Sequence, residues 1–267
     1  MNILVLGDMI VDIYEWYTAT RVCPEAPALV LERKFKSHEH REGGAALVAN
    51  NLRSLAGECN ITAFYGSKSF KRRIFADRTL LCRIDDDSQQ LISPERYARS
   101  IELVIDQMEA IVVSDYGKGA IVGDAVIKVL LQAHLRCPIF VDAKIAPDRY
   151  AGFFALFPNE HEPAPSGKFR HVIRKLGSRG ANVDGVDVPT AEQHVYDVTG
   201  AGDVFLAAFV ASYSTLRTQV FDDDHEMLRQ CAVIANRAAG ISVRHLGTHV
   251  VTPEEMEAEV SLEKESV

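Results

Sequence analysis

Short apolar runs alternate along the chain with longer stretches in which apolar residues recur at helical spacing. The apolar runs predict strands at residues 3–6, 110–113, 138–142, 155–157 and 171–175. The longer stretches predict helices at residues 45–55, 94–108, 124–133, 204–213 and 226–242. Strands that are apolar throughout and alternate with helices are typical of a mostly parallel sheet covered on both faces. We therefore expect an α/β fold.

Two other stretches look extended but fit no buried strand. Residues 14–40 alternate loosely around the turn signal Cys23-Pro-Glu-Ala-Pro27, and residues 70–85 predict further strand with a turn near Asp77. We interpret both as segments of a small β lid. The length of 267 residues favours one large domain, residues 1–267, that carries this lid as an accessory element.

Polar residues follow the ends of several predicted strands. They are Asp8, Ser114, Asp115, Asp142, Asn159 and Lys175. In open parallel sheets, ligands bind at the carboxyl ends of the strands. The sequence therefore predicts that these side chains converge on one crevice.

Composition excludes several classes of function. The net charge is −8 and there is no long Lys/Arg run, which argues against nucleic acid as a partner. The five cysteines lie far apart without a C-x-x-C pair, so neither a disulfide framework nor a zinc site is indicated. No stretch approaches the ~18 apolar residues of a membrane helix, and the first residues do not resemble a signal peptide. We expect a soluble, cytoplasmic protein that does not contact membranes.

The segment Asp197-Val-Thr-Gly-Ala-Gly-Asp203 runs directly into an apolar helix. Glycines at the start of a helix expose backbone N–H groups at its positive end, which makes an anion site. Donors aimed at a transferring phosphoryl group can contribute about 3 kcal/mol each. Asp203 could then accept the proton of an attacking hydroxyl. The structural alternative is an Asp that merely caps the helix, and the apolar helix after a full α/β sheet favours the catalytic interpretation.

This segment resembles the signature of the PfkB (ribokinase-like) carbohydrate kinases, and other motifs agree. Asn159-Glu-His-Glu162 resembles the N-x-x-E motif of the family, and Leu176-Gly-Ser-Arg-Gly180 resembles the turn beside the nucleotide. The resemblance implies a ribokinase-like fold, ATP and Mg²⁺ as cofactors, and catalysis by Gly200, Ala201, Gly202 and Asp203. It implies nucleotide contacts from Lys175, Gly177, Gly180, Asn236 and Thr248. It also implies an indirect Mg²⁺ site, through water, at Asn159 and Glu162.

Within that family the sequence most resembles kinase domains that phosphorylate C1 of a heptose 7-phosphate in lipopolysaccharide precursor synthesis. The matching segments include 7–12, 21–27, 43–46, 114–119, 141–144 and 246–248, and residues 71–85 match without a gap. Taken alone, the basic cluster 68–73 is more simply a solvated strand edge. The resemblance instead implies that it faces a sugar phosphate. The substrate contacts implied are Asp8, Asp12, Gly43, Gly44, Lys71, Arg73, Asp115 and Lys118, with Lys144 as a secondary candidate.

The sequence departs from this pattern in three ways. It is shorter than the family between Leu55 and Lys71, where a strand, a turn and a helix are largely missing, and again between Glu162 and His171. Leu47 stands where many relatives have an Asn that bonds the sugar, which affects substrate identity. The H-x-G-H motif of the nucleotidyltransferase domain found in bifunctional members is not present.

Three hypotheses remain open at this stage. The first is a kinase for a heptose 7-phosphate or a similar sugar phosphate. The second is a kinase for another sugar or a nucleoside. The third is a trimmed, inactive homologue that binds a ligand or a partner enzyme. By analogy with the family, the lid is also expected to pair between two subunits and form a homodimer.

Overall fold

A computed structural model describes residues 1–77, 79–87, 92–121, 123–191 and 193–265. Ten strands in this part of the chain form one sheet, in the order β10-β9-β8-β7-β6-β5-β1-β3-β4, with β2 paired to β1. The strands are β1 (Asn2–Val22), β2 (Leu29–Gly44), β3 (Asn60–Ala76), β4 (Thr79–Asp86), β5 (Ala110–Asp115), β6 (Ile139–Ala143), β7 (Ala155–Leu156), β8 (His171–Lys175), β9 (Ala181–Val183) and β10 (Val186–Val188).

The helices are α1 (Ala45–Leu55), α2 (Pro94–Glu102), α3 (Asp124–Ala133), α4 (Ala201–Leu216), α5 (Asp224–Ser242) and α6 (Pro253–Glu265). Three short 3₁₀ turns lie at Ile105–Gln107, Pro147–Tyr150 and Gly177–Arg179. The six central strands of the sheet pair in parallel, and their order is β3-β1-β5-β6-β7-β8. The β1–β2, β3–β4, β8–β9 and β9–β10 pairs are antiparallel.

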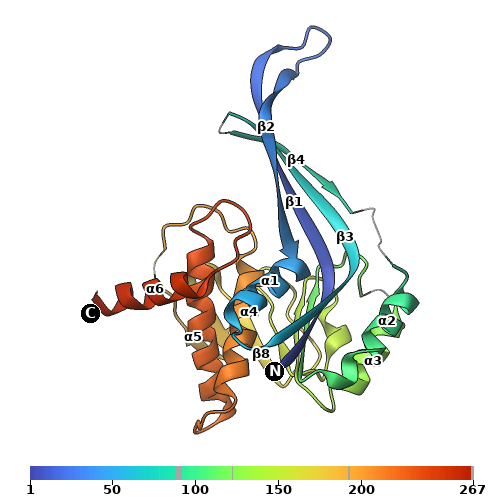
Figure 1. The fold of residues 1–267 in the computed structure, drawn as a ribbon, viewed down its shortest axis with the longest axis vertical. Coiled ribbons are helices and arrows are strands. Elements are labelled where there is room, and N and C mark those ends of the chain that lie inside the picture. The colour runs from blue at the N-terminus through green and yellow to red at the C-terminus, as the bar shows by residue number, and fades with distance from the viewer. Residues whose placement is uncertain (78, 88–91, 122, 192, 266–267) are drawn as a thin grey trace.

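Alternate residues of the central strands point to opposite faces of the sheet. Ile3 and Val5 pack with helices α1, α4 and α5, whereas Leu4 and Leu6 pack with α2 and α3. Figure 1 shows these two groups of helices on opposite sides of the sheet. The period-2 alternation explains why the strands are apolar throughout, since both faces are buried. The predicted α/β class with helices on both faces is confirmed.

The lid is built from continuations of the core strands, and it rises away from the helical layers in Figure 1. The prediction that the first strand ends at Gly7 is wrong, because β1 continues to Val22 after a register shift between Gly7 and Asp8. Gly7 has φ +144°, and a Cβ there would lie 1.9 Å from the Ser114 carbonyl oxygen. Only glycine allows that close approach of two backbones. The shift therefore lets one strand serve both the core and the lid.

The expectation that a strand is missing between Leu55 and Lys71 is also wrong. β3 begins at Asn60, pairs in parallel with the core half of β1, and then continues without interruption into the lid. It turns at Asp77, where φ is +52°, and returns as β4. The basic cluster 68–73 thus lies on a lid strand that is continuous with the core.

Other elements also differ from the prediction. The helix expected at 94–108 ends at Glu102, because the chain must turn before β5, where the Glu109 amide bonds to the Asn2 carbonyl (2.9 Å). Helix α4 begins at Ala201, three residues earlier than expected. Strands β9 and β10 and helix α6 were not predicted, since their short or weakly periodic apolar patterns give little signal.

Candidate active site

The glycine-rich segment forms the start of α4. Gly200 is the N-cap residue with φ +79°, and a Cβ there would lie 2.5 Å from Cδ2 of Leu47. A residue larger than glycine would therefore be both strained and sterically blocked. Ala201, Gly202 and Asp203 form the first helical turn, where backbone N–H groups have no partner within the helix. This turn has the geometry of an anion site.

Asp203 is 2% exposed, and both of its carboxylate oxygens accept a hydrogen bond from the Tyr116 hydroxyl (2.9 and 2.8 Å). Burial raises the pKa of Asp203 from 3.8 to about 6, and the charge of Lys144 only partly opposes that rise. A carboxylate with this pKa is ionised near neutral pH yet is a stronger base than an ordinary aspartate. Asp203 thus has the chemistry of a general base.

The loop that carries Tyr116 is held in place by Asp8. The Asp8 carboxylate is fully buried and accepts hydrogen bonds from the Ser67 hydroxyl and from the backbone amides of Tyr116 (2.7 Å), Lys118 (3.2 Å) and Ala120 (2.8 Å). Four donors use the acceptor capacity of a carboxylate. In this structure Asp8 therefore positions the 116–120 loop, and its contact with a sugar stays a prediction.

Asp115, the residue before this loop, also forms hydrogen bonds within the protein. Its carboxylate accepts the Gly117 amide (2.9 Å) and the Tyr150 hydroxyl, and its side chain is buried. Burial raises the pKa of Asp115. Lys118, farther along the loop, forms an ion pair with Asp87. The side chains of Asp115 and Lys118 therefore support the loop in this structure, and their predicted contacts with substrate are untested.

A cluster of ion pairs lies beside Asp203. The Lys144 ammonium lies 2.7 Å from Asp142 and 3.2 Å from Glu162, and Lys175 forms a second ion pair with Asp142. Burial opposes the charge of Lys144, but Asp142 and Glu162 outweigh it and raise the pKa of Lys144. Burial lowers the pKa of Lys175. Two cations and two carboxylates are therefore concentrated next to the start of α4.

The first and last residues of the N-x-x-E motif, Asn159 and Glu162, form hydrogen bonds with each other. Glu162 accepts hydrogen bonds from the Asn159 side chain (2.7 Å) and backbone amide (2.9 Å), and Asn159 Oδ1 accepts the backbone amide of Glu162 (2.9 Å). An isolated parallel β-bridge between Asn159 and Lys175 places this turn beside the C-terminal end of β8. The motif therefore brings a carboxylate to Lys144, as the predicted convergence at the strand ends requires.

The lid adds further charge above this centre. Arg73 forms a largely buried ion pair with Asp12, and a Cβ on Gly43 would lie 3.0 Å from the same carboxylate. Lys71 lies on the same strand, with its ammonium 5.8 Å from the centre of the Tyr116 ring. Gly44 ends β2 with φ +60°, so the chain can turn directly into α1. The lid residues singled out from the sequence thus lie together at its base.

A cavity of about 620 Å³ opens on the other side of the α4 start. Its lining includes Ala201 and Gly202 and four of the five residues predicted to contact the nucleotide, namely Lys175, Gly177, Gly180 and Asn236. Thr248 does not line it but lies against the Gly200 loop, where its Cγ2 would be 3.1 Å from a Cβ on Gly200. The volume is in the range of small-molecule and cofactor sites.

Two central residues gave no separate signal in the sequence. Tyr116 stands in the Ser-Asp-Tyr-Gly-Lys-Gly motif, but its contact with Asp203, 87 positions away, exists only in the folded chain. Arg41 from the lid donates to the Leu246 carbonyl, and its guanidinium lies 5.6 Å from the centre of the Tyr14 ring. Arg41 therefore ties the lid to the loop after α5.

Comparison with known proteins follows this geometry. Residues 159–255, which include the N-x-x-E turn and the start of α4, match the sequence model of the pfkB family carbohydrate kinases. The stretch that holds the candidate base is therefore similar to pfkB family carbohydrate kinases, and the resemblance seen in the sequence is confirmed there.

The curated relatives share the name "Bifunctional protein HldE". The chain is 28% identical to that of Proteus mirabilis over 313 aligned positions, and 31% identical to that of Pelobacter propionicus over 321. It covers 63% of each relative's length. Both alignments are longer than the 267 residues of this chain, so the chain lacks segments that the relatives have.

Solved structures support the ribokinase-like fold. A ribokinase from Giardia lamblia superposes with a TM-score of 0.69 at 14% identity and covers 98% of both chains. Phosphofructokinase-2 from Escherichia coli gives 0.69 at 13% identity, again with 98% of each chain covered. The predicted ribokinase-like architecture is thereby confirmed. No helix within the described residues is both long and apolar enough to span a membrane.

Proposed function

We propose that this protein is an ATP-dependent kinase that transfers the γ-phosphate to a hydroxyl of a phosphorylated sugar. The observation that carries the proposal is the position of Asp203. It is a buried carboxylate with a pKa of about 6 in the first turn of α4, whose residues Ala201 and Gly202 line the 620 Å³ cavity. This arrangement supports a base that deprotonates the acceptor while the α4 amides stabilise the transferring phosphoryl group.

The cavity fits the nucleotide that this reaction needs. Its lining includes Ala239, Gly240 and Val243 of α5 and its C-terminal end, and also Gly177 and Gly180, whose small size leaves room for a planar base. The Lys175 ammonium lies near the cavity end formed by Gly202, which suits a phosphate chain. When bound, Mg²⁺ would neutralise charge on the phosphates, and Glu162 and Asn159 are the residues that would hold it through water.

The sugar would bind at the base of the lid, and its phosphate group would face Lys71 and Arg73. The two residues point to the same side of β3, because residues two apart on a strand share a face. The resemblance to the heptose kinases and the curated relatives support C1 of a heptose 7-phosphate as the acceptor. Another sugar or a nucleoside is the alternative substrate within the same reaction class.

A substrate panel tests the proposal. ATP consumption with Mg²⁺ would be measured over heptose 7-phosphates, other sugar phosphates, free sugars and nucleosides. We expect turnover only with phosphorylated sugars. Lys71→Met should lower kcat/KM for the phosphorylated substrate by about 10-fold or more, since it removes a charge-assisted contact. Lys68→Met is the matched control on the opposite face of the same strand and should have little effect.

Turnover of unphosphorylated substrates alone would reject the role of Lys71 and Arg73 and favour the second kinase hypothesis. Absence of turnover with every compound, together with tight ATP binding, would favour the inactive homologue. The environment of Leu47 is the observation that supports an inactive homologue. Leu47 is 1% exposed and packs on Gly200, so it offers the sugar no polar group.

We also propose that the lid pairs between two copies of the chain. Apolar side chains on its strands are exposed, including Val22 (66%), Leu29 (51%) and Ile84 (50%). Exposed apolar residues on one extended element favour association. Light scattering after size-exclusion chromatography should give a mass near twice 29.5 kDa. The variant Ile84→Lys should shift it towards the monomer, and a monomeric wild-type protein would reject the proposal.

A further inference from the structure

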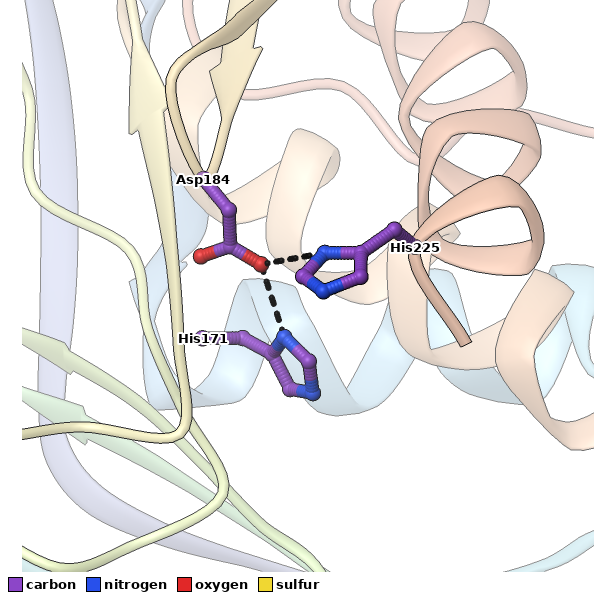
Figure 2. A group of neighbouring side chains, drawn as sticks. All are labelled: His171, Asp184 and His225. Atoms are coloured by element: carbon purple, nitrogen blue, oxygen red, sulfur yellow. Dashed lines mark hydrogen bonds and ion pairs between the residues drawn. The ribbon is translucent and has the colours of Figure 1, made fainter. Parts of the chain in front are cut away.

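Three side chains with metal-binding atoms lie at the far end of β8 from the candidate active site. His171 is the first residue of β8, Asp184 lies in the turn between β9 and β10, and His225 is the second residue of α5 (Figure 2). Lys175 is at the other end of β8, so four residue steps of roughly 3.3 Å separate this group from the ion pairs beside Asp203. It is therefore distinct from the site of phosphoryl transfer.

The three side chains converge on one carboxylate oxygen. Nδ1 of His171 lies 2.7 Å from Oδ2 of Asp184, and Nδ1 of His225 lies 3.1 Å from the same oxygen, as the dashed lines in Figure 2 show. The other oxygen of Asp184 accepts the backbone amide of Val172 (2.7 Å). That bond fixes the orientation of the carboxylate, as hydrogen-bonded partners do for metal-ligating carboxylates.

The three side chains differ in their exposure to solvent. The side chain of His171 is 4% exposed, that of Asp184 is 19% exposed and that of His225 is 49% exposed. Nε2 of His171 is buried, and within the described residues it has no hydrogen-bond partner. The group thus has one side fixed in the protein interior and one side open to solvent.

This set has the composition of a transition-metal site. Each residue offers one ligand atom, and these atoms lie within 4.8 Å of one another. Two imidazoles and one carboxylate form a common ligand set for Zn²⁺, with water in the fourth position. A tetrahedral ion with bonds of about 2.0 Å holds its ligands roughly 3.3 Å apart, so small side-chain shifts would suffice. The exposed side of His225 leaves room for the water.

A second set of three such residues in the described chain is less suited. The rings of His245 and His249 stack in parallel with their centres 3.7 Å apart. The partner Glu255 accepts the Thr252 amide (2.8 Å), and the Thr252 hydroxyl accepts the Glu255 amide (3.3 Å). This reciprocal pair caps α6, so the carboxylate already has a structural role.

We propose that His171, Asp184 and His225 bind a divalent late first-row transition-metal ion such as Zn²⁺. The ion connects the start of β8, the β9–β10 turn and the first turn of α5. The later part of α5 lines the nucleotide cavity through Asn236 and Gly240, so the ion stabilises the frame of that cavity without taking part in the reaction.

Calorimetric titration of untagged, chelator-treated protein with ZnCl₂, without ATP or Mg²⁺, tests the site. We expect one tight site per chain. At a free Zn²⁺ concentration about 100-fold above the Kd, the thermal midpoint should rise by roughly 5–10 °C. His225→Ala should weaken binding by more than about 10-fold, and so should Asp184→Asn, which keeps an oxygen for the Val172 amide. Binding of Co²⁺ should produce the visible absorption of a tetrahedral complex in the wild-type protein but not in His225→Ala or Asp184→Asn.

His249→Ala is the matched control, because it alters the second set of ligands and should retain the tight site. If this variant loses Zn²⁺ binding while His225→Ala keeps it, the ion binds near α6 and the proposal is overturned. No tight binding to the wild-type protein also overturns it, and the three residues are then only a hydrogen-bonded cluster. Neither result depends on whether the protein is a kinase, since no substrate is present.

Discussion

The Tyr116 hydroxyl donates to both carboxylate oxygens of Asp203, at 2.9 and 2.8 Å. The tyrosine backbone is in turn fixed by Asp8, which ends the core part of β1. A chain of hydrogen bonds therefore connects the centre of the sheet to the proposed catalytic base. The hydroxyl favours the ionised form of Asp203 and lowers its pKa, against the larger effect of burial.

The first prediction concerns the pH dependence of catalysis. Asp203 must be deprotonated to act as a base, so kcat should fall as the pH drops through about 6. Tyr116→Phe removes a donor to the carboxylate and should move this acidic limb up by about one pH unit. The measurement is kcat against pH for both proteins. Tyr17→Phe, whose hydroxyl bonds Glu15, serves as control, and an unmoved limb in Tyr116→Phe would contradict the role of the contact.

The second prediction separates the effect of Asp203 on turnover from its effect on the free energy of unfolding. Asp203→Asn should abolish turnover but stabilise the fold. Because the folded-state pKa is raised from 3.8 to about 6, the charged form is disfavoured in the folded protein at pH 7. The variant should gain up to about 3 kcal/mol of unfolding free energy there, and the gain should shrink as the pH falls from 6 towards 4.

Denaturant unfolding at several pH values provides that measurement, and nucleotide binding to the variant shows that the cavity is intact. Retained turnover in Asp203→Asn would exclude this residue as the base. An equal loss of stability at all pH values would instead show that the side chain is needed for packing.

The third prediction concerns Asp142, which pairs with both Lys144 and Lys175. Asp142→Ala leaves two neighbouring cations inside the protein without their common partner. Breaking a buried ion pair in this way costs about 3–5 kcal/mol. We expect a comparable loss in unfolding free energy by denaturant titration. Asp106→Ala, which removes a solvent-exposed partner of Arg136, is the control and should cost less than about 1 kcal/mol.

The fourth prediction concerns Leu47, which the resemblance to the family places where a sugar-binding Asn is expected. Because Leu47 is buried against Gly200, Leu47→Asn places an amide in an apolar environment and should destabilise the protein by about 2–4 kcal/mol. Thermal unfolding checks this, with Leu47→Met as the control of similar volume. A stable Leu47→Asn protein that accepts free sugars would instead show that the amide reaches the substrate.

Local sequence patterns were sufficient to predict the class of fold and to locate the segment proposed to bind phosphate. Runs such as Ile3–Leu6 are apolar at every position because helices cover both faces of the sheet, and this local pattern is enough to indicate α/β architecture. The segment from Gly200 to Asp203 likewise carries its own geometry, since glycine conformations and the helix that follows are properties of neighbouring residues. The predicted convergence of polar residues at the strand ends had the same local basis.

The partners of those residues, in contrast, are known only from the folded chain. Asp8 and Asp142 both follow apolar runs in the sequence. The Asp8 carboxylate accepts hydrogen bonds from backbone amides, whereas Asp142 forms ion pairs with two lysines. The partners of a carboxylate come from chain segments far away in sequence, and no local pattern specifies them. The same holds for β3, whose continuity from core to lid depends on its pairing with β1, and for the meeting of Tyr116 with Asp203.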